Sequence, residues 1–456
     1  MSVRSLRRTA TTFCVVALLL PLLSACASAE KLTIGLMPAP EAIVKGLLKG
    51  AATDQRPISE LPGGGMLYVT DRVPSEKVGG SFYESVRGGT LRAGEAKVAV
   101  QNPDLTWDEM RRDALIKKKG GAIDLRVTAV EEFGLLETPA LPGAPPVDTP
   151  GGPAAGKLAE EINARLALSP DKDVFIFIHG FRVNFENPVL VGAELWHFLG
   201  YQGAFISYSW PATTKVTAYV GDIETAMATA RNLRELIAFI ETSTKAERIH
   251  IIAHSAGTRL AVRAMDQVAL INRHATGSSP RLGNKIENVI LIGSDIDRDA
   301  FIASIADGLL TAQRHLVIYG SSKDSALRAS RAITGHGRLG SMFSGTDLSD
   351  PMNGLFRNNT ERISYIDVTG VEGVDDGLGH SYFRSSPWVS SDILMKLAYR
   401  LYPEERGLVR DTATGIMSFP ADYIERMSVI RTAKRNAPGR RTSPYSGIKA
   451  QSTPPR

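Results

Sequence analysis

Cysteine is almost absent from this chain of 456 residues, which contains only Cys14 and Cys26. Both lie near the amino terminus, and no cysteine follows Cys26. The body of the protein therefore has no thiol pair to oxidise, even in an oxidising compartment. This absence excludes disulfides, thiolate metal sites and a cysteine nucleophile from residues 27–456.

The sequence also has no fixed-period repeat, which disfavours solenoid and propeller folds. It contains no motif of an RNA- or DNA-binding module, so no nucleic-acid partner is predicted. With 43% hydrophobic and 22% charged residues, the composition is that of a globular protein and not that of a disordered one. The body of the chain is therefore expected to fold.

Acidic residues are missing from both ends of the chain. The first 25 residues carry three arginines, and residues 426–456 carry eight lysines or arginines. Subtracting these charges from the net +5 leaves −6 for residues 26–425, so the body is mildly acidic. Because residues 426–456 also contain four prolines and few large apolar residues, they are predicted to form a basic disordered tail. This tail is either simply solvated or loosely attracted to anionic lipid or cell-wall polymer.

Residues 1–29 have the composition of a secretory signal peptide. Three arginines precede an apolar run from Phe13 to Leu23, and small residues follow it. Such a run is too short to remain as a membrane-spanning helix. We therefore expect the protein to be exported.

The end of this leader offers two cleavage sites. Leu23-Ser-Ala-Cys26 resembles the lipobox of bacterial lipoproteins, in which the cysteine becomes the lipidated first residue of the mature chain. This resemblance implies a lipid anchor at Cys26 and a location in the cell envelope, facing the periplasm. The alternative is ordinary cleavage after Ala29, which would give a soluble periplasmic or secreted protein.

The first third of the chain, residues 30–137, is predicted to be rich in β-structure. Three short apolar or alternating runs, Met66–Thr70, Ala96–Val100 and Ile123–Val130, are typical of strands. We expect them to supply the first strands of the main sheet. Residues 138–156 are rich in proline and glycine, which predicts an exposed linker.

Strand-like and helix-like patterns alternate in residues 157–402, the predicted catalytic core. Six short apolar runs predict strands at Val174–Ile178, Ala204–Tyr208, Arg248–Ala253, Ile286–Ile292, His315–Tyr319 and Arg362–Val368. Between them, apolar residues at helical spacing predict helices, one with Ile223, Met227, Ala230, Leu233, Ile237 and Ile240 on one face and another with Leu260, Ala264 and Val268. This alternation predicts an α/β fold whose mostly parallel sheet is covered on both faces. Ligands bind such sheets beyond the carboxyl ends of the strands.

The third of these strands leads directly into a candidate nucleophile. The sequence Ala253-His254-Ser255-Ala256-Gly257 is close to G-x-S-x-G, the nucleophile elbow of hydrolases, with Ala in place of the first Gly. A sharp turn from strand to helix needs small residues around the serine, because the neighbouring backbone comes very close. The turn would place Ser255 at a helix amino terminus, where N–H groups and the helix dipole favour an anion.

An earlier strand ends in His179-Gly180-Phe181. Hydrolases with a nucleophile elbow build an oxyanion hole from the N–H after the nucleophile and an N–H of this earlier loop. These groups would be the N–H of Ala256 and of Phe181. His179, Gly180, His254 and Gly257 would support them, although Gly180 could also be a simple turn glycine.

Five segments together resemble a bacterial α/β-hydrolase family of unknown function that is described as esterase/lipase-like. They are His179-Gly180-Phe181, Ser209-Trp210-Pro211, Ile252-Ala-His-Ser-Ala-Gly257, Asp295-Ile-Asp297 and Gly379-His-Ser-Tyr-Phe383. The resemblance covers about residues 173–400, with weaker similarity at 68–72 and 94–100. It implies the α/β-hydrolase fold and a Ser-Asp-His triad in that chain order, but no defined substrate.

Four histidines follow Ser255 and its neighbour His254, which abuts the serine too closely to serve as its base. His274 lies in a polar loop, and His315 lies in a predicted strand. His380 follows the last predicted strand after a short acidic, glycine-rich loop, which is where this fold delivers its histidine. His380 is therefore the predicted general base, and His336 is the alternative.

The orienting acid should follow a strand that comes after Ser255. Asp324 lies just beyond the strand that starts at His315, and this is the common placement. Asp295 and Asp297, beyond the preceding strand, are the alternative acids. Each of the three could instead cap the helix that follows it.

These residues predict a serine hydrolase that transfers an acyl group from a small-molecule or lipid ester to water, through an acyl-enzyme. No metal and no cofactor is required. The same triad could act on amides or thioesters or could transfer the acyl group to another acceptor, and a non-catalytic envelope scaffold could share the fold. The glycine-rich stretch at 332–359 is predicted to be a lid or acyl-binding wall of the active site, or else a disordered insertion.

Overall fold

The computed structural model describes residues 33–48, 65–77, 79–100, 109, 123–136, 152–274, 282–341, 350–374 and 377–436. The predicted leader and lipobox lie outside these residues. Within them, no helix is both long and apolar enough to cross a membrane.

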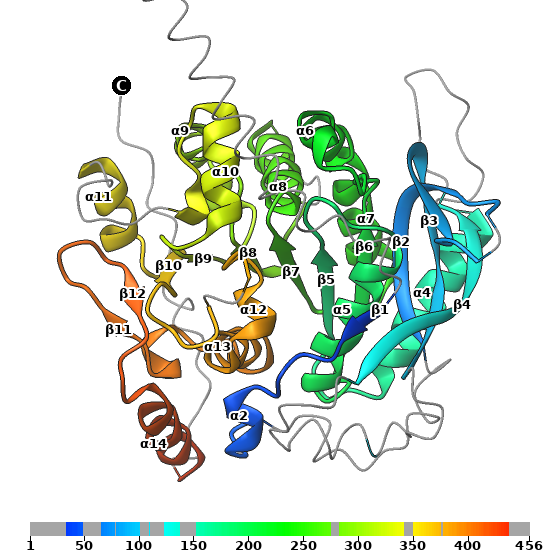
Figure 1. Ribbon diagram of the computed structural model, residues 1–456. Coiled ribbons are helices and arrows are strands. Elements are labelled where there is room, and N and C mark those ends of the chain that lie inside the picture. Colours follow the sequence, from blue (N-terminus) through cyan, green and yellow to red (C-terminus); the bar gives the residue numbers. More distant parts are fainter. Residues whose placement is uncertain are drawn as a thin grey trace, which may run out of the picture.

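One sheet crosses the described part of the molecule, from β1 and β4 at one edge to β12 and β11 at the other (Figure 1). Its twelve strands have the order β1-β4-β3-β2-β6-β5-β7-β8-β9-β10-β12-β11. They are β1 (Thr33–Gly35), β2 (Met66–Pro74), β3 (Tyr83–Val100), β4 (Asp124–Leu135), β5 (Asp173–Ile178), β6 (Ala204–Ser209), β7 (Arg248–His254), β8 (Ile286–Ile292), β9 (His315–Gly320), β10 (Ile363–Asp367), β11 (Val409–Arg410) and β12 (Met417–Ser418).

The central strands are parallel, from β2 through β6, β5, β7, β8, β9 and β10 to β12. At the edges, β1, β4, β3 and β2 pair antiparallel, and so do β12 and β11. All six predicted strands of the core and the three of the first third are present, which confirms the α/β-hydrolase type of fold with an N-terminal β-rich extension.

Helices cover both faces of the sheet, and two apolar layers result. One layer contains α4 (Gly152–Ala167), α6 (Tyr219–Ala228), α7 (Ala230–Ser243), α8 (Gly257–His274), α9 (Arg298–Ala306) and α11 (Asp350–Asn358). The other contains α2 (Glu41–Val44), α5 (Glu186–Phe198), α12 (Tyr382–Ser385), α13 (Pro387–Tyr399) and α14 (Tyr423–Asn436). Residues of β5 alternate between the layers, with Ile176 in the first and Phe177 in the second, as a strand buried on both sides requires.

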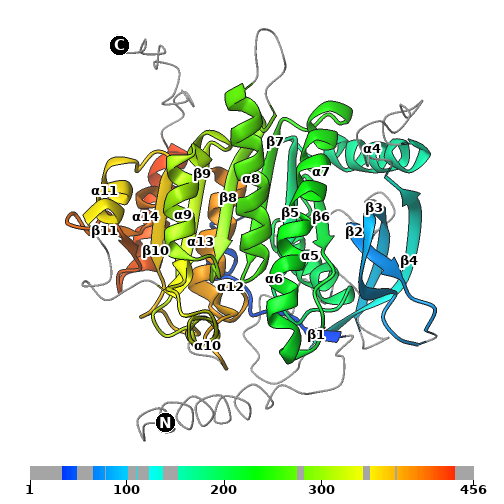
Figure 2. The ribbon, with the colours of Figure 1, turned by 90° about the horizontal axis from the view of Figure 1, so that it is seen from above.

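The remaining helical elements are α10 (Ser325–Thr334) and the short turns η4 (Val216–Ala218), η5 (Leu309–Thr311), η6 (Leu339–Ser341) and η7 (Glu404–Arg406). Seen from above, α7 and α8 lie side by side across the sheet (Figure 2).

The single helix predicted over Ile223–Ile240 is in fact two helices, α6 and α7, that meet at Thr229. The side chain of Thr229 hydrogen-bonds to Asp71 and, at 3.1 Å, to the hydroxyl of Tyr208. Met227 is 41% exposed, whereas Ile237 and Ile240 are buried. The chain turns here to satisfy polar groups of the sheet, which the apolar spacing does not reveal.

The elements of the structure differ from three of the predicted boundaries. Helix α4 begins at Gly152, inside the predicted linker, and residues 138–151 lie outside the described part. The sheet continues past residue 402, because β12 pairs with β10. Helix α14 extends to Asn436, so the predicted basic tail does not begin as a disordered arm at 426. Buried Tyr423 and Met427 anchor this helix on the body.

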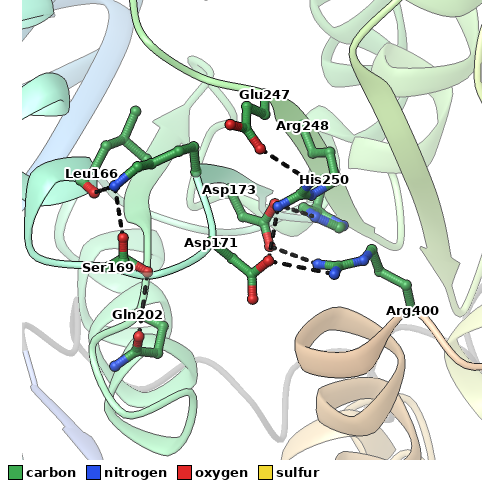
Figure 3. A network of polar contacts seen from close by, with 10 residues as sticks. Leu166, Ser169, Asp171, Asp173, Gln202, Glu247, Arg248, His250 and Arg400 are labelled. Atoms are coloured by element: carbon green, nitrogen blue, oxygen red, sulfur yellow. Dashed lines mark hydrogen bonds and ion pairs between the residues drawn. The ribbon is translucent and has the colours of Figure 1, made fainter. Parts of the chain in front are cut away.

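A network of ion pairs links the amino-terminal ends of β5 and β7 to the carboxyl-terminal end of α13 (Figure 3). Asp173 of β5 pairs with Arg248 of the adjacent β7 and, at 3.2 Å, with Arg400. Asp171 accepts from the same two arginines, at 3.0 and 3.4 Å. These contacts lie at the start of β5 and β7, so the carboxyl ends of these strands, at the other end of the sheet, are left for a ligand.

Candidate active site

Ser255 lies between the end of β7 and the start of α8, in a strained turn. Its φ of +53° is in the left-handed region, which is uncommon for a residue other than glycine. Its N–H donates to the carbonyl of Ile292 at 2.9 Å, and its carbonyl accepts from the hydroxyl of Thr258 at 2.6 Å. The turn is therefore fixed by the neighbouring strand and by the first turn of α8.

The small residues predicted around Ser255 are required by close packing. A Cβ on Gly180 would come within 2.7 Å of the Cβ of Ser255, and one on Gly257 would overlap the carbonyl oxygen of His179. The loop after β5 thus lies directly against the elbow. Ala256 is buried at the amino end of α8.

His380 and Asp324 form a short contact between two loops. Nδ1 of His380 is 2.6 Å from Oδ2 of Asp324, which is fully buried. Asp324 follows β9, and His380 precedes α12, after a loop that follows β10. Burial alone would lower the pKa of His380, but the carboxylate of Asp324 outweighs burial and raises that pKa above its ordinary value.

Gly293, which the sequence analysis did not single out, lies beneath this pair. A Cβ there would be 3.0 Å from Cε1 of His380 and 3.5 Å from Oδ2 of Asp324. The N–H of Gly293 donates to the hydroxyl of Tyr382 at 2.7 Å, and this hydroxyl donates to the carbonyl of Tyr319 at 2.8 Å. The position directly after β8 is the only signal in the sequence that could have indicated Gly293, since its role depends on the packing of α12.

His254 packs against His380 from the elbow side. The ring centroids are 4.7 Å apart, and Nε2 of His254 is 3.1 Å from the carbonyl oxygen of His380. Burial and the nearby His380 lower the pKa of His254 to about 3. A neutral His254 can therefore donate its Nε2–H to this carbonyl and hold His380 in place.

His179 braces the loop that carries Gly180 and Phe181. Its ring is stacked on that of Trp210 at 5.2 Å, and its carbonyl accepts from Nε1 of Trp210 at 2.7 Å. Its own ring nitrogens lie 2.8 Å from the carbonyl oxygen of Gly180 and 3.0 Å from that of Trp210. These contacts between His179 and Trp210 hold the loops after β5 and β6 together.

Ser255 and His380 open onto one cavity of about 650 Å³. One wall is a face of α10, and the other contains Phe181, Val216 and Tyr219. Asp295 and Leu378 contribute to the remaining surface. Of the described residues in the predicted lid, 332–341 and 350–359, only Ile333 lines the cavity. Met342 and Phe343 lie outside the described residues, and Phe356 is buried in the core.

Comparison with known proteins agrees with the fold. Residues 154–397, more than half of the chain, match a family described as alpha/beta hydrolase of unknown function (DUF900). The chain belongs to this family. It is also similar to the uncharacterized protein alr1448 of Nostoc sp. (strain PCC 7120 / SAG 25.82 / UTEX 2576), with 25% identity over 150 residues. That alignment covers 28% of this chain and 39% of the relative.

In this α/β hydrolase, the alternative acids do not contact His380. The carboxylate of Asp295 accepts from Nε of Arg259 at 3.0 Å, from the hydroxyl of Tyr219 at 2.6 Å and from the hydroxyl of Ser330. Asp297 is the N-cap of α9 and accepts from the N–H groups of Asp299 and Ala300.

The alternative histidines of the hydrolase also lie elsewhere. His336 is exposed and 3.8 Å from Asp297, and His274 is exposed in the last turn of α8. His315 is buried, with Nε2 3.0 Å from the hydroxyl of Ser364. Of the histidines that follow Ser255 in the described residues, only His380 lines the cavity that contains the serine.

Proposed function

We propose that this α/β hydrolase is a serine ester hydrolase in which Ser255 is the nucleophile, His380 the general base and Asp324 the orienting acid. The observation that carries the proposal is the 2.6 Å contact between His380 and Asp324, beside a cavity that His380 shares with Ser255. A buried carboxylate on Nδ1 leaves Nε2 free to accept a proton, which is what activation of a serine requires.

In the first half of the reaction, Oγ of Ser255 attacks the ester carbonyl carbon while its proton passes to Nε2 of His380. The electron pair of the C=O double bond moves to the carbonyl oxygen, which becomes an oxyanion. When the double bond re-forms, the bond to the leaving alkoxide breaks, and the alkoxide takes the proton from Nε2. An alcohol departs, and the acyl group remains on Ser255.

In the second half, a water molecule attacks the acyl-serine carbonyl and gives a proton to Nε2. Collapse of the second oxyanion breaks the bond to Oγ, which takes this proton back. The products are a carboxylic acid and the free enzyme, so no metal and no cofactor enters either half.

The oxyanion is assigned to the N–H groups of Ala256 and Phe181. Ala256 precedes the first residue of α8, where the helix dipole and unpaired N–H groups favour negative charge. Gly180 supports the second donor because the absence of a side chain lets the loop approach Ser255. Removal of one such donor typically costs about 10² to 10³ in kcat.

A fluorophosphonate probe followed by a panel of activated esters tests the proposal. The purified wild-type protein should be labelled, and Ser255→Ala should be unlabelled and lose on the order of 10⁶ in kcat without unfolding. Ser381→Ala, which removes an exposed hydroxyl next to His380, is the matched control and should be labelled. Labelling of Ser255→Ala would place the nucleophile elsewhere. A wild type that neither reacts with the probe nor cleaves any ester would indicate a non-catalytic scaffold.

A further inference from the structure

Helix α10 lines the active-site cavity along most of its length, with all of Ser325–Ser330 and Ile333 in the lining. Ser325, Ala329 and Ile333 follow one another at intervals of four residues, and Ala326 and Ser330 lie beside them. Positions four apart share a face of a helix, and at 1.5 Å per residue the span from 325 to 333 is about 12 Å. The cavity is therefore elongated along α10, beginning at the end next to Asp324.

Apart from Arg182, the residues that face α10 across this space present mainly carbon. The rings of Phe181 and Tyr219 pack edge to face at 5.2 Å, and Val216 lies beside them in the lining. The hydroxyl of Tyr219 is turned to Asp295, which it contacts at 2.6 Å.

Polar groups on the α10 side are also engaged with protein partners. The hydroxyl of Ser330 donates to Asp295, whose charge is paired with Arg259 at 3.0 Å. The guanidinium of Arg328 donates to the carbonyl of Ser322 and to the hydroxyl of Ser325. What remains for a ligand along this face is mainly the methyl groups of the alanines and the side chain of Ile333.

Large apolar side chains stand partly in solvent at both ends of the cavity. Leu378, two residues before His380, is 43% exposed, and Ile333, at the far end of α10, is 52% exposed. An isolated exposed apolar residue is ordinary. Two that line the same elongated cavity indicate a surface that a ligand covers.

We propose that this cavity holds an unbranched aliphatic chain of the ester, laid along α10 from His380 to Ile333. An extended chain advances about 1.2 Å per bond, so about 12 Å accommodates about ten atoms. The substrate class is then an ester with a medium or long aliphatic chain, not an acetyl ester of a small alcohol. This inference rests on the proposed function, because it takes Ser255 as the point where the chain begins.

Two ester series test the inference and show which side of the ester carries the chain. One series lengthens the acyl group of p-nitrophenyl esters from two to twelve carbons, and the other lengthens the alcohol of alkyl acetates. In one of them, kcat/KM should rise about three- to fourfold per added methylene up to about ten atoms and then level off. A flat dependence in both series would overturn the inference.

Filling the middle of the cavity should remove this preference. For Ala329→Phe, the ratio of kcat/KM for the decanoyl-length ester to that for the acetyl-length ester should fall about tenfold or more. Ala332→Phe makes the same change at an exposed position of α10 that does not line the cavity, and it should leave the ratio unchanged. Ile333→Asn, at the partly exposed far end of the cavity, should lower the ratio for the longest chains only. This variant tests the inference if Ala329→Phe fails to fold.

The outcomes separate this inference from the proposed function. If the wild type hydrolyses esters through Ser255 but Ala329→Phe and Ala332→Phe have the same chain-length ratio as the wild type, the inference is wrong and the proposed function stands. If no ester in either series is hydrolysed and the fluorophosphonate probe does not react, the proposed function itself has failed.

Discussion

The two carboxylate oxygens of Asp324 make different contacts. Oδ1 accepts from the N–H of Leu327 at 3.0 Å and caps α10, and Oδ2 contacts His380 at 2.6 Å. From the sequence, a helix cap and an orienting acid are alternative roles for this residue. In the structure one side chain occupies both positions, because a carboxylate has an oxygen for each.

This double contact predicts a specific result for Asp324→Asn. Asparagine is as good an N-cap as aspartate, so the variant should keep its fold and melting temperature to within a few degrees. It cannot hold His380 in the required tautomer, and kcat for an activated ester should fall by about 10⁴.

Asp297→Asn is the matched control, since Asp297 also caps a helix but does not contact His380. It should retain most of the wild-type kcat. An active Asp324→Asn protein, together with a folded but inactive Asp295→Asn protein, would move the acid to the loop after β8 and leave Ser255 and His380 in their roles.

The pKa of His380 predicts the acid limb of the pH profile. The base must be neutral to accept the proton of Ser255, and Asp324 raises its pKa above the ordinary 6.5 despite burial. Activity should thus be full above the raised pKa and decline as pH falls through it, with an inflection in kcat/KM above 6.5. His254, with a pKa of about 3, stays neutral over this range and adds no second inflection.

The same titration checks the identity of the acid. In Asp324→Asn the attraction is gone while burial remains, so the inflection of the residual activity should move to lower pH. An inflection that stays at its wild-type position would mean that another group titrates.

At the scale of single residues, the sequence indicated the residues that have a local pattern. Ser255 was predicted because its turn needs small residues on both sides, and His380 because it follows the last predicted strand of the core. Gly293 and Tyr382 have no such pattern. Their importance arises from contacts between the loop after β8, the end of β9 and α12, which are far apart along the chain.

At the scale of elements, buried parallel strands were predicted most accurately. Most of β5 (Val174–Ile178) and the second halves of β7 (Ile251–Ala253) and β8 (Val289–Ile292) are continuous apolar runs, because side chains on both faces of such a strand are buried. The two-residue strands β11 and β12 are too short to show any period, so the sheet was predicted to end too early. The break between α6 and α7 was missed because the tertiary contacts of Thr229 outweigh the helical spacing.

Helix α14 was not predicted, and its residues from 426 onward were assigned to the disordered tail for a different reason. Its sequence is basic and continues into a segment with several prolines, a composition typical of disorder. Two anchoring residues, Tyr423 and Met427, are nevertheless buried four positions apart on one face. A single apolar face of this kind is enough to fold a helix onto an existing surface, even where the overall composition is unfavourable.

At the scale of the whole molecule, hydrogen bonds attach the first described residues to the part of the fold that carries His380. Glu194 of α5 accepts from the N–H of Met37 and from the guanidinium of Arg384, each at 2.8 Å. Arg384 follows His380 by four residues and also donates to the carbonyl of Gly35 at 2.8 Å. The first described residues are thus held on the body without an intervening domain.

This attachment gives the predicted anchor at Cys26 a definite consequence. Thr33, the first described residue, is seven positions after Cys26, a distance of at most about 25 Å when fully extended. A lipid on Cys26 would therefore hold the hydrolase close to the membrane surface, within reach of amphiphilic esters there.

We predict that the mature chain begins at an acylated Cys26 and fractionates with membranes. Cys26→Ser should abolish acylation and move the protein to the soluble fraction, because a lipobox without its cysteine has no thiol to modify. Cys14→Ser, a matched change within the apolar run, should leave both properties unchanged. Mass spectrometry of the amino-terminal peptide decides the matter: a mature chain that begins at Glu30 and carries no acyl group would show that ordinary cleavage after Ala29 occurs and that the protein is released from the membrane.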